Sequence, residues 1–480
     1  MATKKDLVEA HAFSRRRLVT AFVSGAPGGR EVEPVRPGRV LIGGIALSVL
    51  LMAGAAIAGF LLGRPPAQWL DAKSFIISKD TGEQYVVLRG GDDPVIQRVP
   101  NYVSAQLLLG EADLTPSTVR DKYIRTVRLG EDLGIDAAPA SLPTADELVD
   151  DGWTACTAPD TGIKLAVQQE RTVEDLTDSA FLVTSGRQLW LIATAPAVGS
   201  EQGRAYRFEM PRDEVSASTI ADELDFGASA AAPKVPEEWL NLFPLGPPLA
   251  QDEFGVTRSG EQVDYVEAST GLTRYRVGDL VQSSAGDYYL LGDDGVQPLD
   301  PFAGMVYDAV GSRAVQLDGD VRAGLDTPDY PTEWPSAFPS PVLSGALCGV
   351  LHPGDGEAAS VSLATNPTGD ADPAGIGASN HDVDVEPSSG AYVLSGSGEA
   401  ADDGTPFVID TKGARYELVG ASVPDYIGYG SVDPPLVPSA WLGFFEPGVS
   451  LSTNKARRVP EDAPSADSDA ADSADEAGGS

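Results

Sequence analysis

The stretch VPEEWLNLFPLGPPL, residues 235–249, has a second version in the same chain, VPSAWLGFFEPGVSL, residues 437–451. Two of the six tryptophans lie in this match. Ungapped agreement in a segment so rich in Pro and centred on Trp favours duplication over coincidence. We therefore predict that the chain uses one structural element twice. The identical pairs are Val235/Val437, Pro236/Pro438, Trp239/Trp441, Leu240/Leu442, Phe243/Phe445, Gly246/Gly448 and Leu249/Leu451.

Four further segments have the pattern of a β-hairpin, which is an apolar run, a turn containing Gly, and a second run containing an aromatic residue. The first and the fourth share an Asp-Thr turn that is followed by Gly and then Tyr. The second and the fourth precede the two repeated Trp segments. Beyond the amino-terminal part, the chain is therefore predicted to be β-rich and built from small modules. The four segments are FIISKDTGEQYVVL (75–88), FLVTSGRQLWLI (181–192), YYLLGDDGVQPL (288–299) and FVIDTKGARYELV (407–419).

The length and charge of the chain limit its class. Its 480 residues leave room for several hydrophobic cores. It carries 34 basic and 71 acidic residues, a net charge of −37. A body this acidic stays soluble and repels nucleic acid and anionic lipid. Nucleic-acid binding is therefore not expected.

The amino-terminal part has the opposite charge and leads into an apolar run. Residues 1–39 hold eight basic and four acidic residues, and LVEAHAFSRRRLVTAF (7–22) predicts a short helix there. Residues 40–62 carry no charge and one hydroxyl group. As a helix this run would be about 35 Å long, which is enough to cross a bilayer. We expect a single-pass anchor in the cytoplasmic membrane, with the basic end in the cytosol and the acidic bulk outside.

A cleaved signal peptide is the competing interpretation of this run, but it would have a shorter apolar region behind a shorter basic start. Four small residues of the predicted span fall on one helical stripe that could admit another helix closely. General richness in Ala explains that stripe nearly as well. Its members are Gly44, Ser48, Ala55 and Gly59.

The two cysteines, Cys156 and Cys348, both follow the predicted span. Outside the cytosol two thiols usually form one disulfide, and this one would close a long loop worth on the order of 4–5 kcal/mol. Two buried, unpaired thiols are the alternative. Metal binding by two cysteines and three scattered histidines is not expected, and neither is a cofactor.

No motif in the chain makes a positive case for catalysis. The phosphate-binding pattern GxxxxGK[ST], the HExxH zinc motif and the GxSxG nucleophile turn are all absent from the sequence. Pairs of Asp residues occur, but none follows the spacing of a calcium loop. In so acidic a chain, solvated loop carboxylates explain them better, so no catalytic or metal-binding residue is predicted.

The boundaries that we expect follow these features. The stretch LATNPTGDADPAGIGASNHDVDVEPSSG (363–390) is predicted to be a long surface loop, and the last residues, which are acidic, are predicted to be disordered. The expected segments are 1–39 (cytosolic), 40–62 (membrane helix), 64–115 (repeat module 1), 120–178 (first part of the core), 180–252 (module 2), 253–317 (linker and module 3), 318–404 (second part of the core), 405–453 (module 4) and 459–480 (acidic tail).

In their order along the chain, these motifs resemble the EccB family, a membrane component of actinobacterial type VII (ESX) secretion systems. The likeness covers residues 4–452, and its order is more specific than any one motif. It departs at Gln106, where the family usually has Arg, and at Glu446, which replaces the Pro244 of the first Trp segment; the acidic tail lies outside it. The motifs are FSRRRLVTAF, KDTGEQYVVL, PNYVSAQLLLG, LGIDAAPASLP, GWTAC, GALCG and the closing YELVG with VPSAWLGFFEPGVSLS.

The resemblance implies an elongated periplasmic body of mostly β or α+β structure. A central core would carry four repeat modules with approximate two-fold symmetry and would be braced by a disulfide. The repeated aromatic residues would fill equivalent cores, although a binding role on the surface is an alternative; they are Trp239, Phe243, Trp441 and Phe445.

The function implied by the resemblance is that of a structural subunit of the secretion complex. EccC, EccD and EccE-type membrane components, copies of the chain itself and the mycosin protease are the implied partners. Members of the family are also classed as ATPases, and small β modules often bind glycans, so ATP hydrolysis and cell-wall binding are the alternatives.

Overall fold

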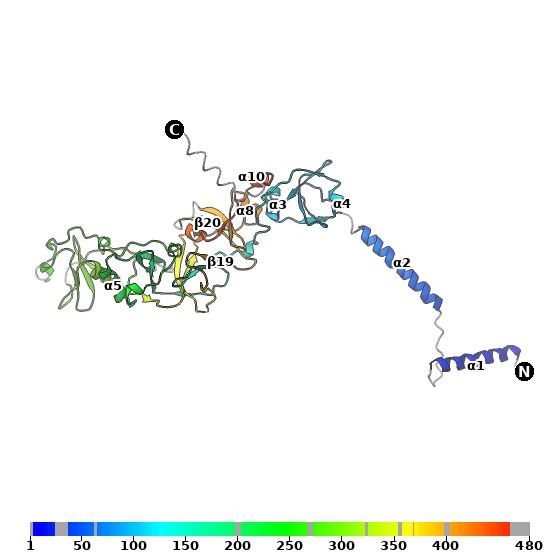
Figure 1. The fold of residues 1–480 in the computed structure, drawn as a ribbon, viewed down its shortest axis with the longest axis horizontal. Coiled ribbons are helices and arrows are strands. Elements are labelled where there is room, and N and C mark those ends of the chain that lie inside the picture. The colour runs from blue at the N-terminus through cyan, green and yellow to red at the C-terminus, as the bar shows by residue number, and fades with distance from the viewer. Residues whose placement is uncertain are drawn as a thin grey trace. The chain divides into compact units, whose positions relative to one another are not determined.

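The computed structural model describes residues 3–24, 37–61, 65–196, 203–266, 272–321, 325–353, 358–367, 369–397 and 404–460. The chain divides into two compact units, Met1–Pro66 and Ala67–Ser480 (Figure 1). The described residues of the first unit form two helices, α1 (Lys4–Ser24) and α2 (Pro37–Leu61). The helix predicted for residues 7–22 is confirmed as part of α1.

Helix α2 contains residues 40–61 of the predicted apolar run and has a strongly apolar sequence; residue 62 lies outside the described residues. The hydroxyl of Ser48 donates a hydrogen bond to the carbonyl oxygen of Gly44 at 2.7 Å, so this polar group is satisfied within the helix. Gly59 belongs to α2, but its surroundings lie outside the described residues. Within the described part of the chain, no helix has both the length and the apolarity that a membrane crossing requires.

The second unit has five β-sheets in its described residues, which we number by their order along the chain. Sheet I has the order β4-β1-β2-β3-β5, with β4 parallel to β1. Helix α3 follows β3; Asn101 caps its start by accepting a hydrogen bond from the Ser104 amide. The elements are β1 (Phe75–Ser78), β2 (Gln84–Arg89), β3 (Val95–Val99), α3 (Tyr102–Leu109), β4 (Pro116–Val119), α4 (Asp121–Ile124) and β5 (Arg128–Leu129).

Sheet IV follows the same path as sheet I. Its order is β14-β13-β12-β15, and β15 returns parallel to β12 after a helix. Asp300 caps that helix and Pro301 opens it, because Pro fits the first turn, where no amide donor is needed. The elements are η5 (Leu272–Arg274), β12 (Leu280–Gln282), β13 (Tyr288–Leu291), β14 (Val296–Leu299), α7 (Pro301–Val310) and β15 (Val315–Gln316).

Sheet III has the order β11-β10-β9-β16 and is followed along the chain by the first Trp segment. Its first three strands form an antiparallel meander, and β16 pairs in parallel with β9. The elements are β9 (Ser179–Ser185), β10 (Gln188–Thr194), β11 (Ala205–Glu209), α5 (Glu214–Glu223), η2 (Ser229–Ala231), α6 (Glu237–Leu240), η3 (Gln251–Phe254) and β16 (Ser340–Pro341).

Sheet V has the order β23-β20-β21-β22-β24 and contains the second Trp segment. Strands β20, β21 and β22 form an antiparallel meander with β23 parallel to β20. The elements are β20 (Ala391–Gly396), β21 (Thr405–Ile409), β22 (Ala414–Glu417), α8 (Val423–Tyr426), β23 (Leu436–Pro438), α9 (Ser439–Leu442), β24 (Glu446–Pro447) and α10 (Thr453–Ala456).

All four predicted hairpins are antiparallel strand pairs: β1–β2, β9–β10, β13–β14 and β21–β22. The first and fourth turn through Gly82 and Gly413, whose φ angles are 79° and 76°. Glycine adopts this left-handed conformation without the strain that a Cβ atom adds. The local hairpin prediction is therefore confirmed, together with its turn chemistry.

Sheet II is assembled from two distant parts of the chain, in the order β19-β7-β6-β17-β18-β8. Strands β6 and β17 pair antiparallel, with Cys156 directly opposite Cys348. These cysteines form a disulfide across 192 residues of sequence, which confirms the predicted pairing. The elements are η1 (Ala145–Glu147), β6 (Trp153–Thr157), β7 (Ile163–Val167), β8 (Glu174–Leu176), β17 (Leu347–His352), β18 (Ser360–Thr365) and β19 (His381–Val385).

One prediction for the central region is wrong. Residues 363–390 are not one continuous loop, because β19 (His381–Val385) lies within them and pairs in parallel with β7. In HDVDV, Val385 is buried in a core and Val383 packs against it, whereas Asp382 is exposed and Asp384 is half-buried. Strand β19 is an edge strand in which Asp alternates with Val. The surrounding Gly, Pro and Asp residues are typical of loops, so the sequence pattern predicted a loop there. The predicted acidic tail lies almost entirely outside the described residues.

Shared hydrophobic cores join the five sheets. One core contains residues of sheets I and V, such as Phe75 and Val408. A second joins sheets II, III and V, and a third joins sheets III and IV through residues such as Leu191 and Leu290. The sheets therefore contact one another in the order I, V, II, III, IV, with the disulfide-bonded sheet II in the middle (Figure 1).

Replacing both cysteines by Ala tests how far the second unit depends on this bond. The bond closes a loop of 192 residues, so its loss is expected to lower the free energy of unfolding by about 4–5 kcal/mol in the chain-entropy account. Urea denaturation followed by circular dichroism measures the change. Reductant should destabilise the natural chain and leave the double variant unaffected; an unchanged midpoint for the variant would contradict the prediction.

Candidate functional site

The two Trp segments pack against the central sheet II. Each begins beside the first strand of a meander and continues into one helical turn, α6 or α9. In both copies Pro precedes that turn, where its fixed backbone angle suits a helix start. The side chains of Trp239 and Trp441 are fully buried, and Phe243 and Phe445 are buried beside them.

Equivalent residues of the two segments make equivalent backbone contacts. Lys234 forms a parallel bridge to Thr184 of β9, and Leu436 forms one to Leu394 of β20. Further on, the Leu249 amide donates to the Glu209 carbonyl at 2.9 Å. The corresponding pair, Leu451 and Glu417, is joined at 2.7 Å. Each segment therefore pairs with the first strand of its meander near the start of the segment and with the last strand near its end.

Glycine is required at one equivalent position in both segments. A Cβ atom at Gly246 would collide with the ring of Phe208 in β11, and one at Gly448 would collide with the ring of Tyr416 in β22. This close approach explains why Gly recurs in a segment that otherwise varies.

The two tryptophans differ in their hydrogen bonds. The indole N–H of Trp239 donates to the carbonyl oxygen of Ala155 in β6 at 2.9 Å. The indole nitrogen of Trp441 is buried and has no hydrogen-bond partner among the described residues. Its segment contacts sheet II through rings instead, because Phe445 packs edge-on against Trp153 at a centroid distance of 5.5 Å.

A hollow of about 410 Å³ lies where the two segments face each other. Glu238 and Asn241 line it from the first segment, and Ala440 and Gly443, which occupy the same positions in the repeat, line it from the second. His381 closes one side, with its ring edge-on to Phe444 at 5.3 Å. The two copies have therefore diverged in polarity at the place where they meet.

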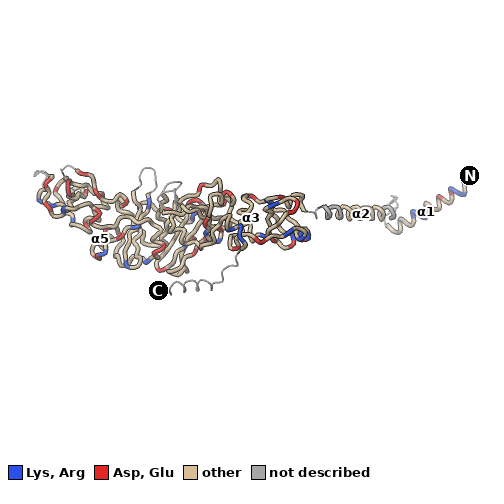
Figure 2. The backbone as a smooth tube through the Cα atoms, turned by 90° about the horizontal axis from the view of Figure 1, so that it is seen from above, with Lys and Arg blue, Asp and Glu red and all other residues tan. Residues whose placement is uncertain are grey.

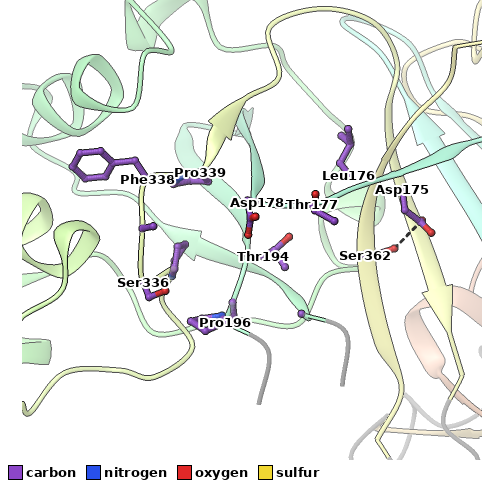
Figure 3. Close-up of a pocket in the computed structure, with 14 residues that line it drawn as sticks. Asp175, Leu176, Thr177, Asp178, Thr194, Pro196, Ser336, Phe338, Pro339 and Ser362 are labelled. Atoms are coloured by element: carbon purple, nitrogen blue, oxygen red, sulfur yellow. Dashed lines mark hydrogen bonds between the residues drawn. The ribbon is translucent and has the colours of Figure 1, made fainter. Parts of the chain in front are cut away.

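A second cavity, of about 360 Å³, lies between sheets II and III (Figure 3). Asp175 lines it from β8, Thr177 and Asp178 line it from the β8–β9 connection, and the segment that carries Phe338 closes the opposite side. Its lining mixes hydroxyl and carboxylate groups with proline and one exposed aromatic ring. Ser362 of β18 borders it and links the cavity to a polar network behind the sheet edge.

That network joins five side chains across sheet II. Nδ1 of His352 lies 3.2 Å from Oδ1 of Asp151, and Nε2 lies 3.0 Å from Oγ of Ser362. The Ser362 hydroxyl donates to Asp175 at 3.2 Å, and Arg171 donates to both Asp175 oxygens at 3.2 Å. The hydrogen bond to His352 lowers the pKa of Asp151.

The order Asp151–His352–Ser362 matches that of a hydrolytic triad, but the fourth member changes its chemistry. The Ser362 hydroxyl donates to Asp175, so its proton is not directed at His352 as activation of a serine nucleophile would require. We interpret the network as a polar brace between β17, β18 and the segments before β6 and β8.

Sequence reasoning did not find this network. His352 and Ser362 are ten residues apart, but Asp151 is 201 residues from His352. The alternation of polar and apolar residues in β18 predicts that Ser362 faces outward. The neighbouring sequence does not predict that His352 and Asp175 are its hydrogen-bond partners. In the described part of the chain, no three or more His, Cys, Asp or Glu residues are grouped so as to hold a metal ion.

Replacing each Trp by Phe in turn should separate packing from hydrogen bonding. Trp239→Phe removes the donor to Ala155, whereas Trp441→Phe removes an indole that has no described acceptor. We expect Trp239→Phe to lower the free energy of unfolding by about 1–2 kcal/mol more than Trp441→Phe does. Urea denaturation of the two variants measures this, each serving as the size-matched control of the other. Equal losses would show that the hydrogen bond is not used.

The brace should be visible in the pH dependence of stability. Folding lowers the pKa of Asp151 below its ordinary 3.8, so its stabilising effect is full above about pH 5 and disappears as pH falls through the lowered value. Because the side chain is 61% exposed, Asp151→Asn should cost only about 0.5 kcal/mol at neutral pH. Melting temperatures between pH 7 and pH 3.5 test this, with Asp150→Asn as the neighbouring control. A deficit that grew as the pH fell would contradict the sign.

Comparisons with known proteins agree on one family. The family described as "Type VII secretion system ESX-1, transport TM domain B" (T7SS_ESX1_EccB) matches residues 1–465. No curated protein sequence matches the chain closely.

The fold is similar to chains of three solved structures. A chain of an intact ESX-5 inner membrane complex is 20% identical, with a TM-score of 0.62 and 97% of each chain covered. A chain of the ESX-5 periplasmic assembly is 20% identical, with a TM-score of 0.57, and covers 83% of this chain and 99% of its own length. A chain of an EccB3 dimer from the ESX-3 core complex is 23% identical, with a TM-score of 0.58, and the match covers 80% of this chain and 100% of that one.

The family match spans nearly the whole sequence, and the fold agrees with it over the same range. The protein therefore belongs to the EccB family of type VII secretion systems.

Proposed function

We propose that this protein is a structural subunit of a type VII secretion complex in the cytoplasmic membrane, where most of the chain forms a periplasmic scaffold. The observation that carries the proposal is the family match over residues 1–465. The similar solved chains come from an ESX inner membrane complex and from its periplasmic assembly. Five sheets that share continuous cores suit a part whose work is to hold a shape.

Anchoring by one helix, residues 40–62, is part of the proposal. Its support is the absence of charge in that run, the helical conformation of α2, and the internal hydrogen bond of Ser48. The basic residues before the run favour a cytosolic amino terminus. The stripe Gly44, Ser48, Ala55 and Gly59 would let a helix of another membrane component approach closely.

We further propose that the extracytoplasmic part is an internal duplication with approximate two-fold symmetry about sheet II. Sheets I and IV would be one equivalent pair of modules, and sheets III and V the other. The matched backbone contacts of the two Trp segments support this, as do the parallel return strands β4 and β15, each of which follows a helix. The disulfide that joins the two central strands would then lie near the symmetry axis.

The proposed partners are EccC, EccD and EccE-type membrane components, a second copy of this chain, and the mycosin protease. Self-association is supported by the similarity to a chain of an EccB3 dimer. Two Trp segments whose facing positions differ, Glu238 and Asn241 against Ala440 and Gly443, give the scaffold two inequivalent halves with which to contact different neighbours.

Extraction of the membrane complex in mild detergent tests the function and the stripe together. The tagged full-length chain is expected to co-purify with the other membrane components. Gly44→Leu with Ser48→Leu should reduce their recovery, because the larger side chains prevent close helix approach. Ala46→Leu with Ala53→Leu, on the opposite helix face, is the matched control. Absence of all partners from the natural chain would contradict the function; equal recovery from both variants would contradict only the stripe.

A further inference from the structure

The charge of the protein is distributed unevenly after the apolar run. Residues 67–130, which form sheet I and its helices, hold eight basic and eight acidic residues. Residues 131–480 hold 17 basic and 59 acidic residues. Figure 2 shows blue positions beside red ones on this module near α3, whereas along the rest of the second unit red is more frequent than blue. Four of the eight basic residues lie within nine positions, RDKYIRTVR (120–128).

These four side chains are exposed and weakly paired. Arg125 is 81% exposed and lies 3.7 Å from Asp121. Arg128 is 70% exposed and lies 3.8 Å from Asp93, which is 82% exposed. The ammonium group of Lys122 lies 4.7 Å from the ring centre of Tyr123. Such exposed ion pairs are weak, so these cations can exchange their present partners for others at little cost.

Apolar groups lie among the cations. Leu129, the residue after the last Arg, is 56% exposed, and Tyr123 is half-buried. Long basic side chains interleaved with Tyr and Leu are typical of surfaces that meet the polar headgroup region of a bilayer.

The basic segment lies where the chain enters the module. Trp69 and Ile124 belong to one small hydrophobic cluster, against which Leu70, Tyr123 and Val127 pack. Helix α2 ends at Leu61 and this unit begins at Ala67. The link between them has five residues, which span at most about 20 Å at full extension.

We propose that residues 120–129 of sheet I form a lipid-binding surface for the anionic headgroups of the bilayer that α2 enters. Arg120, Lys122, Arg125 and Arg128 would contact the phosphates, while Tyr123 and Leu129 lie at the headgroup boundary. This inference rests on the proposed membrane anchor. It gives the acidic protein a local attachment that offsets the repulsion of the remaining surface by the same lipids.

The acidic tail is the rival occupant of this surface. It follows Arg458, whose carbonyl accepts a hydrogen bond from Gly134 near sheet I. An acidic tail would pair with the cations and leave Leu129 exposed to water. A bilayer would contact both the cations and Leu129, and the link to α2 is short enough to allow this. An acidic surface of another protein would likewise leave the apolar residues unused.

Acetylation of Lys122 measures the contact directly. The full-length chain is placed in nanodiscs of phosphatidylcholine alone or mixed with phosphatidylglycerol, and the rate of labelling is followed by mass spectrometry. We expect labelling of Lys122 to slow by about fivefold in the anionic discs, and high salt should restore the rate. Lys412, which is exposed on a different sheet, should react equally in both disc types.

Arg120→Gln with Arg125→Gln should abolish the lipid dependence of Lys122 labelling. Arg212→Gln with Arg313→Gln, at two exposed cations of other modules, is the charge-matched control and should preserve it. Equal labelling of the natural chain in both disc types overturns the proposal. The proposal is also overturned if Lys122 is protected in both disc types and deletion of residues 461–480 removes that protection, because the acidic tail would then be the group that covers the surface. A chain that fails to enter the discs contradicts the anchor itself, whereas equal labelling in a chain that has entered contradicts only the lipid contact.

Discussion

The packing of the two Trp segments against the disulfide-bonded sheet II is the interaction on which the architecture of the second unit depends. Each meander has only three antiparallel strands, and a module of this size buries too little apolar surface to be stable alone. Trp239 and Trp441 fill the same continuous core as Trp153 and the aliphatic residues of sheets II, III and V. Each Trp therefore makes its module part of a larger core.

The disulfide and the aromatic packing act on different states of the protein. The covalent link restricts the unfolded chain, because it ties together residues 192 positions apart. The tryptophans stabilise the folded state through burial and, for Trp239, through the bond to Ala155. The polar brace around His352 adds little free energy at its exposed end. It specifies how the edge of sheet II meets the preceding segments.

A scaffold built in this way presents different chemistry along its length. The module that follows α2 is electrically neutral with a basic edge, whereas the remaining chain is strongly acidic. The excess of negative charge on residues 131–480 limits unspecific association and keeps this part of the chain soluble. The two hollows, one between the Trp segments and one beside Ser362, place polar groups where sheets or segments meet. The fold is continuous, but its surfaces are specialised.

The sequence by itself determined the features that depend on neighbouring residues. Turn glycines and alternating apolar residues predicted all four hairpins, the Trp repeat predicted a recurring element, and two cysteines after an apolar run predicted one disulfide. Tertiary structure alone decided that HDVDV is an edge strand, that His352 meets Asp151, and that Trp239 but not Trp441 finds a described acceptor. Hairpins are encoded by contacts over a few residues, whereas these outcomes depend on how segments 84 or more positions apart pack and pair. Local pattern carries no record of that packing and pairing.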